Sequence, residues 1–209
     1  MTNSRRLLVP YVVEGDTDVP FAVRLIEAAG ALAGTRYVTG GKPRLLQRTG
    51  SYQEPARRHP WLMLVDRDEQ FDCAPSAARA WNPQPGAFMT FRVVEQAVEA
   101  WALGDRVAAA KYFGIRESWI PEVPESLSNP KRVLVDLARS ATRREIRKDM
   151  TPRPNSGRAQ GPGYEARLIE FGQTHWDPQR ARVKCPSLDR ALVRLESTLR
   201  HFGEKHGLV

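Results

Sequence analysis

Hydrophobic residues in this chain form short continuous runs that alternate with helix-like patterns. Four runs are rich in β-branched and other apolar residues and are bounded by Gly, Pro or charged residues, which predicts buried strands. They cover residues 6–13, 36–39, 61–65 and 87–94. Apolar positions three and four apart predict helices over 19–29 and 95–110, and a weaker pattern predicts one within 43–52. Largely apolar strands that alternate with helices are typical of an α/β fold with a mainly parallel sheet.

The pattern changes beyond Pro121. The stretch PEVPESLSNP (121–130) reads as a linker or loop, and helical patterns follow at about 130–150 and 188–206. Between these helices, TPRPNSGRAQGPG (151–163) is rich in Pro, Gly and Arg, which predicts a long loop. We therefore expect two parts: residues 1–115 form the α/β domain that carries the catalytic residues, and residues 116–209 form a basic helical extension packed on it.

The chain is strongly basic, with 32 Lys and Arg against 24 Asp and Glu and a net charge of +8. Such a balance favours a polyanionic partner, of which nucleic acid is the usual one, although charge also serves solubility. The excess is concentrated, because residues 132–167 hold nine Lys and Arg against four Asp and Glu. Seven residues in and near this segment are candidates for nucleic-acid binding: Arg143, Arg144, Arg147, Lys148, Arg153, Arg158 and Lys184.

Several function classes find no support in the sequence. No apolar run is long enough to span a bilayer, and the apolar stretch near the N-terminus is too short for a signal peptide. Cys73 and Cys185 cannot form a disulfide framework, and the four histidines lack zinc-site spacing. No phosphate-binding loop ending in GK[ST] is present, so any ATP use requires another chain. These observations predict a cytoplasmic protein without a membrane partner.

Carboxylates follow the predicted strands. Glu14 ends the first strand, Asp66 and Asp68 end the third, and Glu99 lies in the helix after the fourth. Ligands of an open parallel sheet bind beyond the carboxyl ends of its strands, so these side chains are expected at one edge. Asp66 and Asp68 point the same way in an extended segment, and Glu95 and Glu99 would lie one turn apart on a helix.

Like charges at one edge are costly unless a positive charge is held among them. Mg²⁺ and Mn²⁺ prefer oxygen ligands, often carboxylates together with water and substrate phosphate. The sequence therefore predicts a metal site that uses Glu14, Asp66, Asp68 and Glu99. Asp16 and Asp18 have a simpler interpretation, because acids after a strand commonly cap the next helix.

The stretch VVEGDTD (12–18), followed by LVDRDEQ (64–70), resembles the Toprim domain. This Rossmann-like domain is shared by topoisomerases, bacterial primases, RecR-type repair proteins, ribonuclease maturases and overcoming-lysogenization-defect nucleases. Its pattern is a Glu after the first strand and an Asp-x-Asp after the third. The resemblance implies an α/β Toprim domain with a four-stranded, mainly parallel sheet flanked by helices.

A narrower resemblance comes from VVEQAVEAWALGD (93–105), HWDP (175–178) and CPSLDRAL (185–192). These stretches are similar to a small stand-alone family of uncharacterised Toprim-like proteins, often associated with AAA-type or ABC-type ATPases in bacterial defence. The resemblance implies that Glu14 is a metal ligand or general base, that Asp66 and Asp68 bind Mg²⁺ or Mn²⁺, and that Glu99 serves a second metal. A lysine near the scissile phosphate has no secure equivalent, and Lys42 and Lys184 are the candidates.

The leading hypothesis is a metal-dependent nuclease that works with a separate ATPase in an anti-phage or DNA-maintenance system. Two alternatives stay open: a maturase-like ribonuclease, and a non-catalytic scaffold or regulator of a partner ATPase or toxin. Homo-oligomers are also possible in each case. Among the aromatic residues, Trp81, Trp101, Trp119 and Trp176 are expected in the core or an interface, and Tyr164 is considered as an exposed contact.

Overall fold

Four parallel strands form the centre of the molecule in the computed structural model, which describes residues 6–67, 71–82 and 84–208. The strands are β1 (Leu8–Val13), β2 (Leu32–Val38), β3 (Trp61–Asp66) and β4 (Met89–Val94). Their order is β2-β1-β3-β4, and each neighbouring pair is parallel. The α/β class with a parallel four-stranded sheet is confirmed, and its arrangement is consistent with a Rossmann-like domain.

The central strand β3 is apolar because both of its faces are covered. Residues 61–65 are all buried, and alternate positions belong to two different hydrophobic clusters. Leu62 and Leu64 pack on the side of α1 (Val19–Ala28), whereas Met63 and Val65 pack on the side of α2 (Lys42–Gln47) and α3 (Thr49–Gln53). Helices on both faces explain why the strand reads as a continuous apolar run.

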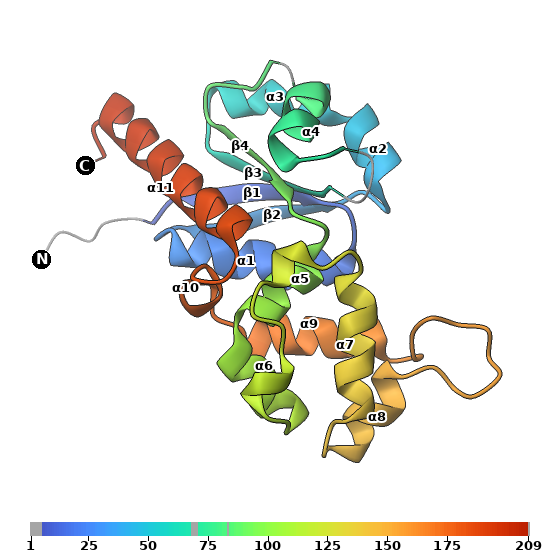
Figure 1. Cartoon of the computed structure of the whole chain (residues 1–209). Helices are drawn as coiled ribbons and strands as arrows, with labels where there is room; N and C mark the ends of the chain where they lie inside the picture. The colour runs from blue at the N-terminus through green and yellow to red at the C-terminus, as the bar shows by residue number, and fades with distance from the viewer. Residues whose placement is uncertain (1–5, 68–70, 83, 209) are drawn as a thin grey trace, which may run out of the picture.

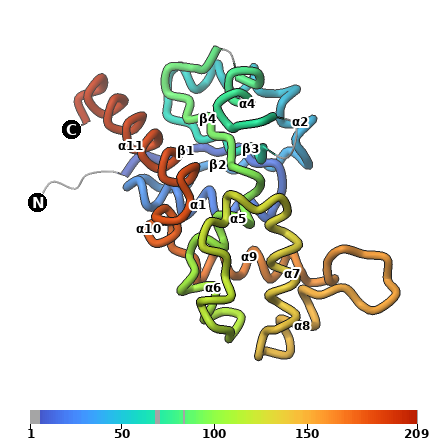
Figure 2. The backbone as a smooth tube through the Cα atoms, in the orientation of Figure 1, coloured from blue at the N-terminus to red at the C-terminus, as the bar shows by residue number. Residues whose placement is uncertain are grey.

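The remaining helices surround the sheet unequally (Figure 1). Helix α4 (Ala74–Trp81) lies on the side of α2 and α3, and the other seven helices of the described chain lie on the side of α1. The latter are α5 (Val98–Gly104), α6 (Arg106–Phe113), α7 (Pro130–Arg139), α8 (Arg144–Met150), α9 (Tyr164–Thr174), α10 (Pro178–Ala181) and α11 (Pro186–His206). Single 3-10 turns lie at η1 (Asp16–Asp18), η2 (Pro55–Arg57), η3 (Glu117–Trp119) and η4 (Pro124–Ser126). The loop between α8 and α9 extends away from the rest of the chain (Figure 2).

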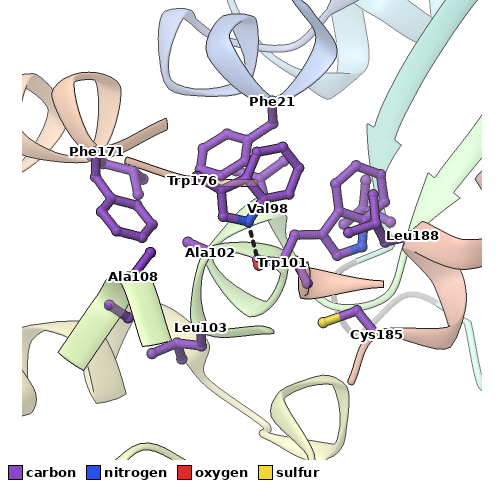
Figure 3. Close-up of a cluster of buried hydrophobic side chains, with 14 of the residues drawn as sticks. Phe21, Val98, Trp101, Ala102, Leu103, Ala108, Phe171, Trp176, Cys185 and Leu188 are labelled. Carbon is purple, nitrogen blue, oxygen red and sulfur yellow. Dashed lines mark hydrogen bonds between the residues drawn. The ribbon is translucent and has the colours of Figure 1, made fainter. Parts of the chain in front are cut away.

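Two tryptophans join the C-terminal helices to the sheet domain (Figure 3). The indole N–H of Trp176 donates to the carbonyl oxygen of Trp101 at 2.9 Å, and the ring of Phe21 contacts Trp176 edge-on with centroids 4.8 Å apart. The indole N–H of Trp101 in turn donates to the Ser187 hydroxyl at 2.8 Å. Both tryptophans are fully buried, as expected, whereas Trp119 is 52% exposed. One hydrophobic core therefore continues from α1 and α5 into α11, and the division at residue 115 stays a prediction.

The helix expected over 95–110 is two helices with a break. Helix α5 begins only at Val98, after Gln96 with a left-handed φ of 64°, so Glu95 does not lie one helical turn before Glu99. The chain breaks again at Asp105, whose carboxylate accepts a hydrogen bond from the N–H of Ala108 and caps α6. The prediction of a shared helical face for Glu95 and Glu99 is therefore wrong.

Helices α4 and α9 were not predicted, and α9 matters for the site. A Cβ atom at Gly172 would lie 2.9 Å from the ring of Pro20, so glycine lets α9 approach α1 closely. This packing places Tyr164, the first residue of α9, inside the protein with 3% exposure. The interpretation of Tyr164 as an exposed contact is therefore wrong.

Candidate active site

Glu14 lies where β1 ends, and the backbone around it is held from two sides. Its carboxylate accepts a hydrogen bond from the N–H of Asp66 at 2.8 Å, which joins the ends of β1 and β3. Its carbonyl oxygen accepts hydrogen bonds from the N–H groups of Gly40 and Gly41 at 3.0 and 2.9 Å. Both glycines have left-handed φ angles, 74° and 119°, which explains why this turn after β2 requires glycine.

Asp66 is the last residue of β3 and is partly buried. Burial raises its pKa well above the ordinary value, and the charges of Asp18, Glu99 and Glu14 raise it further. The positive charge of Lys131 acts in the opposite direction. Asp66 is thus a carboxylate at the edge of the sheet on which three other carboxylates act.

Glu99 lies in the first turn of α5 and is only 2% exposed. One carboxylate oxygen accepts a hydrogen bond from the Tyr164 hydroxyl at 3.2 Å, and the other, Oε2, is buried without a hydrogen-bond partner. Burial is the main reason that the pKa of Glu99 is raised, and Lys131 is the main influence that lowers it. A buried carboxylate oxygen without a partner is costly in a folded protein.

Asp18 belongs to the same group of acids, although its sequence position suggests only a helix cap. Its carboxylate does accept a hydrogen bond from the Gly15 N–H at 2.9 Å, but it makes no cap hydrogen bond to α1. The side chain is buried, and burial raises its pKa while the Gly15 hydrogen bond and Lys131 lower it. Asp16, in contrast, is exposed.

The structure brings together Glu14, Asp18, Asp66 and Glu99, which we call the acid cluster. Asp68, the second acid of the Asp-x-Asp pair, lies outside the described residues. Within the described ranges, no group of three or more Asp, Glu, His or Cys side chains is arranged so that it could hold a metal ion. The carboxylates of the cluster influence one another's pKa values, but those described do not form a metal site as they stand, so the metal site stays a prediction.

Lys131 is the cation that sequence reasoning missed. It lies in the first turn of α7, is exposed, and its charge lowers the pKa of Asp18, Asp66 and Glu99. The lysines considered from the sequence have other neighbours. The Lys42 ammonium lies 5.3 Å from the centre of the Trp81 ring, and Lys184 forms an ion pair with Glu122 at 2.8 Å.

A basic pocket of about 430 Å³ lies beside α7. Lys131, Arg132, Arg139 and Arg158 line it together with residues of the 151–163 loop. Lys131 thus lines this pocket and also influences the acid cluster.

A second basic hollow of about 350 Å³ shares Arg139 with the first. Its other lining residues include the predicted contacts Arg144, Arg147 and Lys148. The Arg147 guanidinium also donates to the carbonyl oxygens of Ala141 and Thr142, so part of its hydrogen-bonding capacity supports α8. The shared arginine makes the two hollows one basic strip.

The remaining predicted contacts do not line this strip. Arg143 is exposed near Glu145 and the Tyr112 ring, and Arg153 is exposed in the 151–163 loop. Lys184 is engaged with Glu122, as described above. Their assignment to nucleic-acid binding stays a prediction without further support.

The EAW…D and HWDP stretches form a structural junction. The Asp105 carboxylate is 1% exposed and receives two hydrogen bonds from the Arg180 guanidinium, at 2.9 and 2.7 Å. It also accepts from the N–H of Asp177 at 2.8 Å. Glu95 is likewise engaged elsewhere, in an ion pair with Arg67 at 3.0 Å. These acids hold segments together and lie outside the acid cluster as we define it.

No protein-family model, curated protein or solved structure matches this chain. The Toprim resemblance and the partner ATPase therefore stay predictions that rest on the sequence motifs. No helix in the described part of the chain is long and apolar enough to cross a lipid bilayer.

Proposed function

We propose that this protein is a metal-dependent nuclease that hydrolyses phosphodiester bonds in DNA or RNA. The observation that carries the proposal is the acid cluster at the carboxyl edge of a parallel sheet, together with Lys131, which lines a basic pocket and lowers the pKa of the clustered acids Asp66 and Glu99. Ligand sites in open α/β sheets occupy this edge. Carboxylates favour hard divalent cations, and a cationic pocket favours the phosphates of the substrate.

Carboxylate oxygens are the ligands that a divalent cation prefers, although the described carboxylates do not form a metal site as they stand. Glu99 presents a buried carboxylate oxygen without a hydrogen-bond partner, and the pKa of Asp66 is raised by burial and by three neighbouring carboxylates. Both features are relieved when positive charge is added among these groups. Glu14, Asp66 and Glu99 would hold the cation, and Asp18 would add negative charge beside it. A bound cation of this kind activates water and stabilises the leaving oxygen.

The protein's own side chains would supply position and charge. The Glu14 carboxylate accepts a hydrogen bond from the Asp66 N–H and so fixes the end of β3. This contact would keep the distance between the two carboxylates constant. Tyr164 orients Glu99 through its hydroxyl. Lys131, which lines the basic pocket, would contact the phosphate next to the cluster, and Arg132 and Arg139 would hold the strand beyond it.

The proposal is tested with purified protein and labelled DNA and RNA in Mg²⁺, Mn²⁺ or EDTA. Cleavage should require a divalent cation and should be lost in Asp66→Ala, while nucleic-acid binding is retained. Asp16→Ala is the matched control, because it removes an exposed carboxylate from the same strand-to-helix connection. Equal cleavage in EDTA and in Mg²⁺ would overturn the proposal.

The cleavage assay and an assay of cellular function separate the two alternatives. Cleavage of structured RNA without cleavage of DNA would select a maturase-like ribonuclease. A cellular function that survives both Glu14→Ala and Asp66→Ala would select the scaffold or regulator.

A further inference from the structure

Arg92 is an unusual residue on the edge strand β4. It faces α11, because Thr90, two residues earlier on the same face, shares a hydrogen bond of 3.0 Å with Thr198 of that helix. The Arg92 side chain is partly buried, and its Nε atom is buried without a hydrogen-bond partner. Guanidinium groups in such positions normally donate to a carboxylate or a carbonyl oxygen.

The charges that act on Arg92 are also positive. Arg190 and Arg194 lie one turn apart on α11. Burial lowers the pKa of Arg92, and the charges of these two arginines lower it further. Among the described residues, no carboxylate forms an ion pair with any of the three, although Arg190 lies close enough to Glu125 to lower the pKa of that carboxyl. Three cations gathered without an ion pair to a described carboxylate favour an anion.

A groove of about 550 Å³ includes one member of this arginine cluster, Arg194, in its lining. Helices α4 and α11 both pack against β4, and the groove takes one arginine from each: Arg79 and Arg194. Its apolar part comes from Pro85, Met89 and Phe91. The groove therefore combines an aromatic ring with guanidinium groups at the open edge of the sheet.

We propose that the groove at the edge of β4 binds a nucleotide unit of a single-stranded nucleic acid. The phosphate would contact Arg194, which lines the groove, and Arg190 one turn away on α11, the charge of Arg92 would add to theirs, and the base would lie against Phe91. Guanidinium groups match phosphate oxygens in geometry and charge, and an aromatic ring stacks with a base only when the base is unpaired. An acidic peptide would satisfy the arginines but would make no use of Phe91. The nucleic-acid class rests on the proposed function, whereas binding in this groove can be measured without cleavage.

The test is fluorescence anisotropy in EDTA with single-stranded DNA and RNA oligonucleotides of about 12 nucleotides. The variant is Arg190→Ala combined with Arg194→Ala, because both side chains are exposed and their loss leaves the core intact. The matched control is Arg58→Ala combined with Arg200→Ala, which removes the same charge from exposed positions outside the groove.

The groove variant should bind at least about 10-fold more weakly than the control, and its salt slope should fall by about 1.4 for two lost phosphate contacts. Phe91→Ala should weaken oligonucleotide binding by about 5-fold or more, while leaving the binding of inorganic phosphate unchanged. Equal affinities of the groove variant and the control would overturn the proposal.

Two further outcomes distinguish this proposal from the others. Binding of a polyglutamate peptide that depends on Arg190 and Arg194, without oligonucleotide binding, would identify a protein-docking surface and contradict the proposal. Groove-dependent binding in a protein that never cleaves with any metal would support the groove and contradict only the nuclease. If the groove variant cleaves and binds with unchanged affinity, the result would support the nuclease and contradict the groove.

Discussion

The carboxylate of Glu14 accepts a hydrogen bond of 2.8 Å from the backbone N–H of Asp66. This contact joins the ends of two neighbouring parallel strands and keeps their carboxylates at one edge of the sheet. Glu14→Gln preserves the accepting oxygen and removes the charge. If Glu14 holds a cation, cleavage should fall by about 100-fold or more, while thermal unfolding changes little.

Glu14→Ala provides the comparison, because it removes both the charge and the accepting oxygen. The Asp66 N–H is then left without its partner, and the free energy of unfolding should fall by about 1–3 kcal/mol. A Gln variant that cleaves like wild type would show that Glu14 serves the fold alone.

Asp66→Asn should change how stability depends on pH. Because the folded-state pKa of Asp66 is raised, its contribution to stability is greatest below the ordinary aspartate value of 3.8 and is lost as the pH rises through the raised value. The Asn variant carries no such titration. In EDTA its free energy of unfolding should therefore exceed that of wild type by an amount that grows with pH.

The measurement is urea unfolding of both proteins at a series of pH values. Mg²⁺ should stabilise wild type more at high pH than at low pH, since the cation and the proton compete for the same carboxylate. Asp16→Asn is the control, because it makes the same change at an exposed position. A pH-independent difference between Asp66→Asn and wild type would contradict the raised pKa.

Lys131→Ala should raise the pKa of Asp66 and Glu99 further, because Lys131 is the positive charge that lowers both. Lys131→Arg keeps the charge and should leave the two titrations near those of wild type. Carboxyl-carbon NMR titration of the metal-free protein measures the effect directly and does not depend on activity. Lys111→Ala, at an exposed position on α6, should have no effect.

Tyr164→Phe removes the hydroxyl that donates to the buried carboxylate of Glu99. The Glu99 carboxylate, whose Oε2 atom already lacks a hydrogen-bond partner, would then lose its side-chain donor, and the free energy of unfolding should fall by about 1–3 kcal/mol. Under the proposed function, cleavage per folded molecule should fall as well, since Glu99 loses the group that orients it.

Tyr112→Phe is the matched control for this change. The Tyr112 hydroxyl also contacts a carboxylate, that of Glu170 at 3.1 Å, but outside the acid cluster. It should reduce stability without reducing cleavage. Equal losses of cleavage in the two variants would show that Tyr164 acts only through folding.

Asp105→Asn should destabilise the protein by about 3 kcal/mol, because Asp105 is the buried partner of the Arg180 guanidinium. Chemical denaturation measures the loss, and cleavage normalised to folded protein should stay unchanged. A selective loss of cleavage in a stably folded Asp105→Asn protein would move this residue into the active site.

The sequence by itself determined the order of the four strands along the chain and the positions of three of the four clustered acids, but not helices α4 and α9. These features are local: apolar runs form the buried strands, and acids at their ends reach the same edge because the strands are parallel. It also determined the long basic loop between α8 and α9, through its Pro and Gly content.

Tertiary structure decided the rest of the site. Asp18 reads as a cap in the sequence, and its burial beside Asp66 follows from the packing of α9 against η1 and α1. Lys131 and Tyr164 lie far along the chain from Glu14, and only the docking of α7 and α9 brings them to the acids. Residues that meet across long sequence separations leave no periodic signal, because their contact depends on how whole helices pack. For the same physical reason, the arginine cluster at the edge of β4 exists only once α11 crosses that strand.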